Sequence, residues 1–245
     1  VICLWCVVGN AQPAPDGRAF AAIYAAEVDR RLVVPLAEQA SYAALLPTLE
    51  GGSQFVALVD RSPFIQAFLL FWLDSTGRPH FIGASPVSTG RPGRFDYFET
   101  PLGVFAHTLE NPDYRALGTR NSLGIRGYGV KGMRVYDFGW VRQKKGWGNG
   151  EEIEMRLQMH ATDPRLLEPS LGKPRSKGCI RIPGTLNTLL DRFGILDADY
   201  QREASEGRRH FTLRPDWQPT PWSGRFLVVI DSARTERPPW SPEPT

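Results

Sequence analysis

The segment EEIEMRLQMH, residues 151–160, alternates polar and apolar side chains. Ile153, Met155, Leu157 and Met159 share one face, and charged or amide side chains occupy the other. A period of two residues is typical of a strand that buries one face. The segment therefore predicts a half-buried strand with His160 at its end.

A cysteine follows in the segment GKPRSKGCIRIP, residues 172–183. Arg175, Lys177 and Arg181 lie within four residues of Cys179. Neighbouring cations favour the anionic form of a thiol. We therefore expect an electropositive setting and a reactive Cys179, with Lys177 contributing to the thiolate.

A helix is predicted directly after this segment. Pro183 fits a first turn, Leu186, Leu189, Leu190 and Phe193 recur at helical spacing, and Gly194 fits the C-terminal cap. Cys179 is thus expected in a loop between a strand and a helix.

Most of the remaining chain also predicts strands. Apolar runs at 55–60, 65–74, 80–90 and 225–231 are separated by turns rich in Gly and Pro. Residues 17–50 predict a helical N-terminal segment, in which Pro35 begins a second short helix. We expect a mainly β domain over 51–231 and a disordered tail over 232–245.

The first 16 residues resemble the end of a secretory signal peptide followed by a linker. The apolar run VICLWCVV precedes small residues that could form a cleavage site, although a basic start is missing. A buried first strand is the alternative. The run is too short to span a bilayer, so no transmembrane helix is expected. Removal of Cys3 and Cys6 with the signal would leave Cys179 without a disulfide partner in an exported protein.

Composition excludes few classes of protein. The 245 residues carry a net charge of +3, with 29 basic and 26 acidic side chains. Such a balance gives no general electrostatic reason to expect nucleic-acid binding. Zinc binding is also disfavoured, because His80, His107 and His210 show no ligand spacing with Cys179. No cofactor is expected.

Cys179 and His160 have the properties of a nucleophile and its base. A thiol nucleophile requires a proton acceptor and N–H donors that stabilise the oxyanion formed on the attacked carbonyl. His160 is the best candidate for the base, and the N–H groups of Gly178 and Cys179 are candidates for the oxyanion donors. A lone histidine at a strand end is, on its own, more often a surface residue.

The combined pattern resembles the L,D-transpeptidase catalytic domain of the YkuD type. That family has the motif S-H-G-C-[IV]-R with an upstream histidine, which here is matched by SKGCIR at 176–181 and by His160. A second match is PVSTG at 86–90 followed by TPLGVF at 100–105, which is similar to the family pattern S-T-G…T-P-x-G-x-F.

The resemblance implies a β-sandwich of mixed sheets, with one helix after a catalytic loop that carries the cysteine. It implies action on peptidoglycan stem peptides, with Cys179 as the nucleophile, His160 as the base and the carbonyl of Ala161 as the partner of the imidazole. Ser176, Lys177 and Arg181 would shape the substrate pocket, and Arg181 would pair with a substrate carboxylate.

The chain departs from the family pattern at two positions. Ala161 replaces the glycine that usually follows the histidine, and Lys177 replaces the usual histidine. Three alternatives therefore stay open: an L,D-carboxypeptidase that uses water, a wall-binding homologue without turnover, and an unrelated cysteine peptidase in which Asp163 orients His160.

Overall fold

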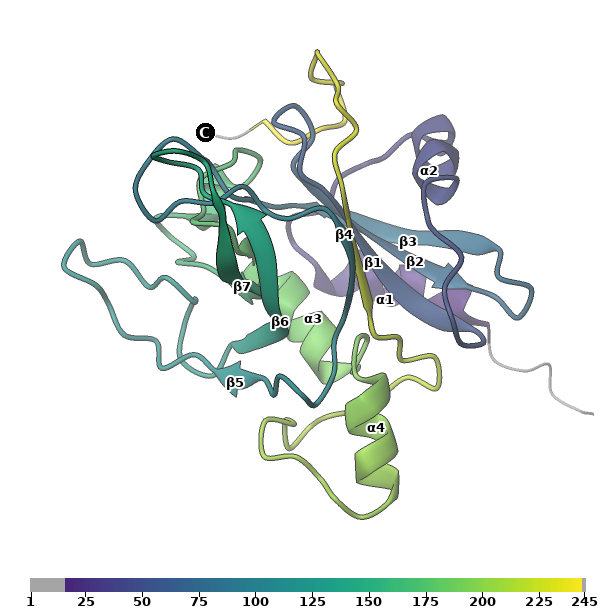
Figure 1. The fold of residues 1–245 in the computed structure, drawn as a ribbon. Helices are drawn as coiled ribbons and strands as arrows, with labels where there is room; N and C mark the ends of the chain where they lie inside the picture. Colours follow the sequence, from purple (N-terminus) through teal and green to yellow (C-terminus); the bar gives the residue numbers. More distant parts are fainter. Residues whose placement is uncertain (1–15, 244–245) are drawn as a thin grey trace, which may run out of the picture.

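Two mixed β-sheets form the body of the computed structural model, which describes residues 16–243 (Figure 1). The first sheet has the strand order β3-β2-β1-β9-β4, and the second has the order β5-β6-β7-β8. The predicted mainly β fold of mixed sheets is therefore confirmed. The strands of the first sheet are β1 (Gln54–Asp60), β2 (Ala67–Leu73), β3 (Pro79–Pro86), β4 (Gly103–Ala106) and β9 (Phe226–Ile230).

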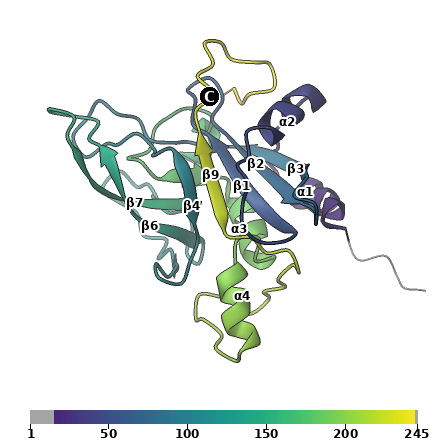
Figure 2. The same ribbon diagram turned by 45° about the vertical axis from the view of Figure 1, so that its right-hand side comes forward.

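The central strands of the first sheet are buried on both faces. Every residue of β1 and β2 is buried, as their continuous apolar runs predict. The chain returns at its end to insert β9 between β1 and β4 (Figure 2). β9 pairs in parallel with β1 and antiparallel with β4.

The second sheet contains the strand from which the sequence analysis began. Its strands are β5 (Tyr114–Arg115), β6 (Arg134–Lys144), β7 (Glu152–Ala161) and β8 (Ile180–Ile182). β6 and β7 pair antiparallel, and β7 and β8 pair in parallel with His160 opposite Arg181. The exposed and buried residues of β7 alternate only in its first half, and both faces are buried from Leu157 to Ala161.

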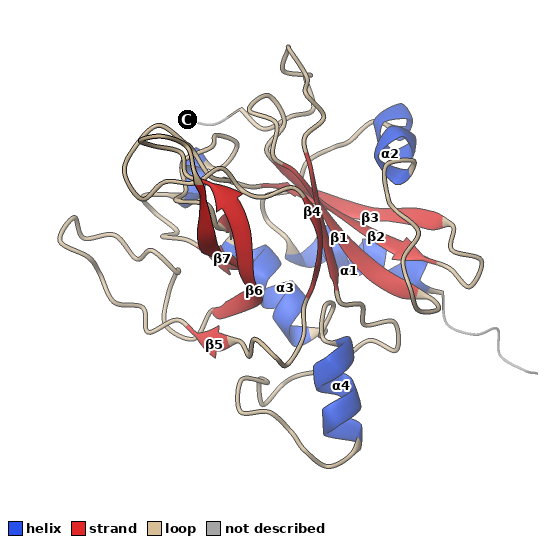
Figure 3. Ribbon diagram, in the orientation of Figure 1, coloured by secondary structure: helices blue, strands red, loops and turns tan. Residues whose placement is uncertain are grey.

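Four α-helices occur in residues 16–243 (Figure 3). The N-terminal segment forms α1 (Phe20–Glu27) and α2 (Leu36–Ala43), with Pro35 at the N-cap of α2 as predicted. The segment after β8 forms α3 (Gly184–Arg192) and α4 (Ala198–Ser205). Short 3₁₀ helices occur at Gly17–Ala19 and Glu168–Ser170.

The main hydrophobic core lies between the two sheets and α1 and α3. It joins Phe55 and Phe68 of the first sheet to Leu157 and Ile180 of the second. A second cluster, on the other face of the first sheet, includes Tyr42 of α2, with Trp240 of the C-terminal segment packed on it. Together these clusters bury the apolar faces that the strand patterns predict.

Three expectations from the sequence need correction. Two helices, rather than one, follow the cysteine segment. Cys179 directly precedes the short strand β8 and does not lie in a continuous loop between a strand and a helix. Part of the predicted disordered tail, residues 232–243, packs on the body: Ser241 Oγ donates to the carbonyls of Phe64 and Ile65 at 2.7 and 3.0 Å.

The predicted signal segment cannot be compared with the structure, because residues 1–15, including Cys3 and Cys6, lie outside the described part. None of the helices within residues 16–243 is long and apolar enough to cross a bilayer.

Candidate active site

Cys179 lies at the edge of β7, immediately before β8 begins. Its half-buried thiol donates to the Arg156 carbonyl at 3.9 Å, and the N–H of Gln158 donates to the sulfur. These two backbone groups on β7 lie beyond the paired region of β8. The thiol therefore lies at an unpaired part of the β7 edge, which β8 would cover if it began earlier in the chain.

His160 is held in one orientation at the end of β7. Only 5% of its surface is exposed, and its Nδ1 lies 2.6 Å from the carbonyl oxygen of Ala161. The carbonyl can only accept, so Nδ1 carries the proton and Nε2 is the basic nitrogen. The ring of Tyr128 packs on the imidazole at 4.5 Å between centroids.

The resting pair is neutral. Burial, with a smaller contribution from the Arg181 charge, lowers the pKa of His160 to about 4, although the bond to the Ala161 carbonyl acts in the opposite direction. Burial raises the pKa of the Cys179 thiol above its usual value, although the Gln158 N–H and Arg181 act in the opposite direction. The expected thiolate is therefore not favoured in this arrangement.

The three cations near Cys179 in sequence make different contacts. Lys177 pairs with Asp96, with Nζ and Oδ2 2.6 Å apart, and its ammonium lies over the ring of Tyr97. The Arg175 carbonyl accepts from the Arg181 guanidinium at 3.5 Å. Of the three cations, only Arg181 contributes notably to the pKa of the thiol.

The hydroxyl of Ser176 accepts a hydrogen bond from the Gly178 N–H, which the sequence analysis proposed as an oxyanion donor. The N–H of Gly178 donates to Ser176 Oγ at 3.1 Å, and the same hydroxyl donates to the Cys179 carbonyl at 2.5 Å. The Gly178 N–H is therefore occupied, which leaves the N–H of Cys179 as the candidate oxyanion donor. The assignment of Gly178 to this role was wrong for the arrangement seen here.

Gly178 instead allows two segments of the backbone to approach each other closely. Its φ of +134° disfavours a side chain, and an added Cβ would lie 2.8 Å from Met155 Cε. An added Cβ at Gly90 would meet the Gly178 Cα at 2.9 Å. The backbones around Gly90 and Gly178 thus come together where neither residue can carry a side chain.

Thr100 explains why the STG and TP motifs accompany the cysteine motif. Its fully buried hydroxyl donates to the Gly178 carbonyl at 2.7 Å and accepts from the Gly90 N–H at 2.8 Å. Ser88 and Arg181 exchange two further backbone hydrogen bonds of 3.0 Å. The second motif therefore fixes the backbone that carries Cys179.

Sequence reasoning missed the polar side chains beside the thiol. The Gln158 side chain donates to Asp137 Oδ2 at 2.8 Å and accepts from the hydroxyls of Tyr114 and Tyr128 at 3.3 and 3.4 Å. Arg156 pairs with the same oxygen of Asp137 at 2.7 Å. The two-residue period of β7 could have identified these side chains, because Arg156, Gln158 and His160 share one face.

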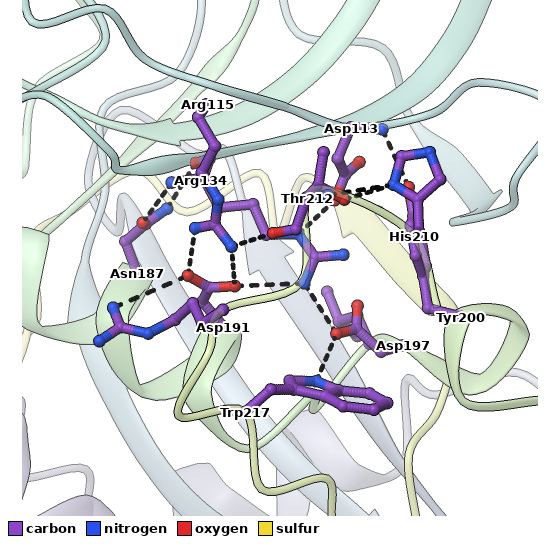
Figure 4. A network of polar contacts seen from close by, with 12 residues as sticks. Asp113, Arg115, Arg134, Asn187, Asp191, Asp197, Tyr200, His210, Thr212 and Trp217 are labelled. Atoms are coloured by element: carbon purple, nitrogen blue, oxygen red, sulfur yellow. Dashed lines mark hydrogen bonds and ion pairs between the residues drawn. The ribbon is translucent and has the colours of Figure 1, made fainter. Parts of the chain in front are cut away.

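A buried ionic network holds the start of β6, which pairs with His160 (Figure 4). Arg134 has no exposed surface and contacts three aspartates: Asp113 at 2.5 Å, Asp197 at 2.7 Å and Asp191 at 3.3 Å. His107 donates to Asp113 across 2.8 Å. Burial is the largest influence and lowers the pKa of His107, but the charge and hydrogen bond of Asp113, together with the charge of Asp197, outweigh it and raise that pKa. Val135, the next residue, lies opposite His160 in the sheet.

The alternative role of Asp163 as the partner of His160 lacks support in the geometry. Asp163 accepts from the backbone N–H groups of Arg126, Arg165 and Leu166 at 3.0 Å each, whereas the imidazole of His160 contacts the Ala161 carbonyl. Within residues 16–243, no group of three or more His, Cys, Asp or Glu side chains is arranged to hold a metal ion.

Comparison with known proteins gives little further information. No family model and no curated protein matches the chain. Among solved structures, it is similar to the crystal structure of the L,D-transpeptidase (residues 123–326) from Xylanimonas cellulosilytica, with 18% identity over 81% of this chain and 71% of that chain. The TM-score is 0.31, which is too low to support an argument about function.

Proposed function

We propose that the chain is an exported cysteine L,D-transpeptidase that acts on peptidoglycan tetrapeptide stems through a thioester. The observation that carries the proposal is that Cys179 directly precedes β8, the strand that pairs with the end of β7 where His160 lies, and that Nδ1 of His160 is bonded to the Ala161 carbonyl. Both sequence motifs contribute to this arrangement, because Thr100 bonds to Gly178.

The first half-reaction transfers the stem to the enzyme. The sulfur turns from the Arg156 carbonyl toward the imidazole, and Nε2 of His160 takes the thiol proton. As this proton is transferred, Sγ attacks the carbonyl carbon of an L,D-peptide bond, and the Cys179 N–H stabilises the oxyanion. The imidazolium returns its proton to the departing amine, so the terminal D-amino acid leaves and a thioester remains.

The second half-reaction regenerates the thiol. An acceptor amine attacks the thioester carbonyl while Nε2 of His160 takes the proton of that amine. The tetrahedral intermediate expels the thiolate, which is protonated by the imidazolium. The acceptor is a side-chain amine of another stem, which gives a cross-link, or a free D-amino acid, which gives exchange.

Incubation with purified disaccharide-tetrapeptide fragments tests the proposal. Mass spectrometry is expected to detect the released D-residue together with a cross-linked or exchanged product. Cys179→Ala should abolish every product while retaining the folded state, which circular dichroism would verify. Undiminished turnover by that variant would exclude the proposed nucleophile.

Two other outcomes distinguish the alternatives. A shortened stem without any transfer product identifies an L,D-carboxypeptidase, in which water replaces the acceptor amine. Binding of stems without a product or a thioester adduct identifies a wall-binding homologue. The export part of the proposal is tested separately by fractionating cells and sequencing the N-terminus of the mature protein.

A further inference from the structure

A cleft of about 440 Å³ beside the thiol segment is lined by five cationic side chains. Arg91 and Arg94 come from the segment before β4, and Arg175, Lys177 and Arg181 come from the cysteine segment and β8. No acidic side chain lines this cleft. The other residues of its wall are uncharged and include Tyr97 and Leu123.

Three of these cations have no counter-charge. Arg91, Arg94 and Arg175 are exposed, and within residues 16–243 their guanidinium groups take part in no hydrogen bond or ion pair. Lys177 differs, because Asp96 neutralises it at 2.6 Å. The cleft therefore offers three free guanidinium groups in addition to Arg181.

The backbone brings two of these arginines together. The Arg91 N–H donates to the Ser176 carbonyl at 3.1 Å, and the Arg175 N–H donates to the Thr89 carbonyl at 2.9 Å. The segments that carry Arg91 and Arg175 are therefore hydrogen-bonded to each other. Like charges held close together repel, and an anion that binds between them would reduce this repulsion.

The position of Arg181 connects the cleft to the reaction. Arg181 follows Cys179 by two residues and pairs with His160 across the sheet. From this geometry we infer that the cleft binds the donor stem through two or more free carboxylates and discriminates against the same stem with these groups amidated. The inference rests on the proposed function, since it names the charge state of that substrate.

Guanidinium groups suit this task because their planar forks bind carboxylates bidentately. A carboxamide has the same shape but no charge, and its N–H₂ group cannot accept. Exposed ion pairs are individually weak, so the discrimination arises from several arginines acting together. We expect about a tenfold preference for the free-acid stem at low salt.

Binding is measured by calorimetry on the Cys179→Ala protein, so that no turnover occurs. The probes are the tetrapeptide stem fragment with free carboxylates and the same fragment with carboxamides. The preference should fall with rising salt, because screening weakens exposed ion pairs. It should also disappear in the Arg91→Gln/Arg94→Gln variant and diminish in Arg175→Gln.

Arg78→Gln serves as the matched control. Arg78 is exposed in the turn between β2 and β3, a part of the chain that does not line the cleft, and the substitution removes the same charge. It should leave the preference unchanged. An equal loss of preference in Arg78→Gln would mean that the preference depends on the net charge of the protein and not on the cleft. That result would overturn the inference.

Failure of the inference and failure of the proposed function give different results. Equal affinity for the two stems overturns the inference, even when the wild-type protein turns both over. A charge preference without turnover by the wild-type protein supports the cleft and contradicts the transpeptidase. Tighter binding of inorganic polyphosphate than of the free-acid stem would overturn the inference in favour of a phosphate polymer.

Discussion

Burial changes the acid–base properties of Cys179 and His160 in opposite directions. It raises the pKa of the thiol and lowers that of the imidazole to about 4. Both shifts favour the neutral forms, so in the proposed mechanism proton transfer is expected to accompany the attack and not to precede it. The site therefore resembles a hydroxyl nucleophile with its base more than a preformed thiolate–imidazolium pair.

This neutral pair predicts a specific pH dependence. Because His160 must be unprotonated to act as the base, kcat/KM should rise as pH increases through about 4 and stay level up to about pH 8. The midpoint for alkylation of Cys179 should lie above the usual thiol value of about 8.5. Stopped assays and iodoacetamide labelling would measure both, with circular dichroism confirming the fold at each pH.

Lys177→Met should leave the alkylation midpoint unchanged, since Asp96 already neutralises that ammonium. A midpoint below 8.5 for the wild-type protein, or a clear upward shift in Lys177→Met, would show that the cations do stabilise a thiolate.

Thr100 provides a second test at the scale of one side chain. Thr100→Val keeps the shape but leaves the Gly90 N–H without its acceptor and the Gly178 carbonyl without its donor. Each lost partner in a buried site costs about 1–3 kcal/mol. We expect lower stability in urea and a kcat reduced at least tenfold, because the backbone of Cys179 shifts. Thr100→Ser keeps the hydroxyl and should restore kcat; a normal kcat in Thr100→Val would remove Thr100 from the positioning of the thiol.

Among the elements, β6 connects the buried ionic network to the active site. Arg134 begins this strand, and the next residue, Val135, lies between Tyr114 of β5 and His160 of β7. Asn187 of α3 exchanges two hydrogen bonds with the Arg134 backbone, at 2.9 and 3.1 Å. The position of His160 therefore depends on contacts made at the start of the neighbouring strand.

Loss of the Arg134 guanidinium should destabilise the whole domain. Arg134→Met leaves Asp113, Asp191 and Asp197 without their shared counter-charge, and breaking a buried ion pair in this way costs about 3–5 kcal/mol. Urea unfolding measures the effect. Arg142→Gln removes a charge from an exposed position of the same strand and should change stability by less than about 0.5 kcal/mol. Similar losses in both variants would contradict a special role for the network.

At the scale of the whole molecule, the C-terminal segment closes the outer face of the first sheet. Trp240 packs edge-on against Tyr42, with 5.9 Å between ring centroids, and Arg237 donates to the carbonyls of Pro63 and Pro242 at 2.8 and 2.6 Å. This segment is rich in proline and charge, but it gains enough contacts to take a fixed path.

Trp240→Ala should therefore reduce stability although the residue lies far from the proposed chemistry in sequence. The half-buried indole covers apolar surface of Tyr42, and its loss should lower the free energy of unfolding by about 1–2 kcal/mol. Thr235→Ala, at an exposed position of the same segment, is the control. Equal stability of the two variants and the wild-type protein in urea would mean that the segment contributes nothing.

Local patterns explain which parts of the fold were predictable. β1, β2, β7 and β9 have apolar runs or clear alternation, and Pro35, Pro183 and Gly194 mark helix ends. β5 and β8 are too short to show a period, and α4, with the sequence ADYQREAS, has no apolar stripe. The network around Arg134 could not be predicted, because its aspartates come from distant parts of the chain.

For the candidate site too, local sequence patterns pointed to residues but not to the contacts and burial that determine their chemistry. The motif identified Cys179 and His160, but the pKa of each depends on burial, which adjacent cations do not reveal. The pairing of Lys177 with Asp96 joins residues far apart in the chain. The bond between Ser176 and the Gly178 N–H is local, and a serine two residues before a glycine was a signal that could have been used.

The insertion of β9 has a consequence for the order in which the protein can fold. β1 is made long before one of its neighbours in the sheet, residues 226–230. Within residues 16–243, β4 pairs with no strand other than β9. Before residues 226–230 have been made, the chain can form the β1–β2–β3 meander but not the complete sheet, so the apolar edge of β1 stays open until then. β9 thus determines when the first sheet closes.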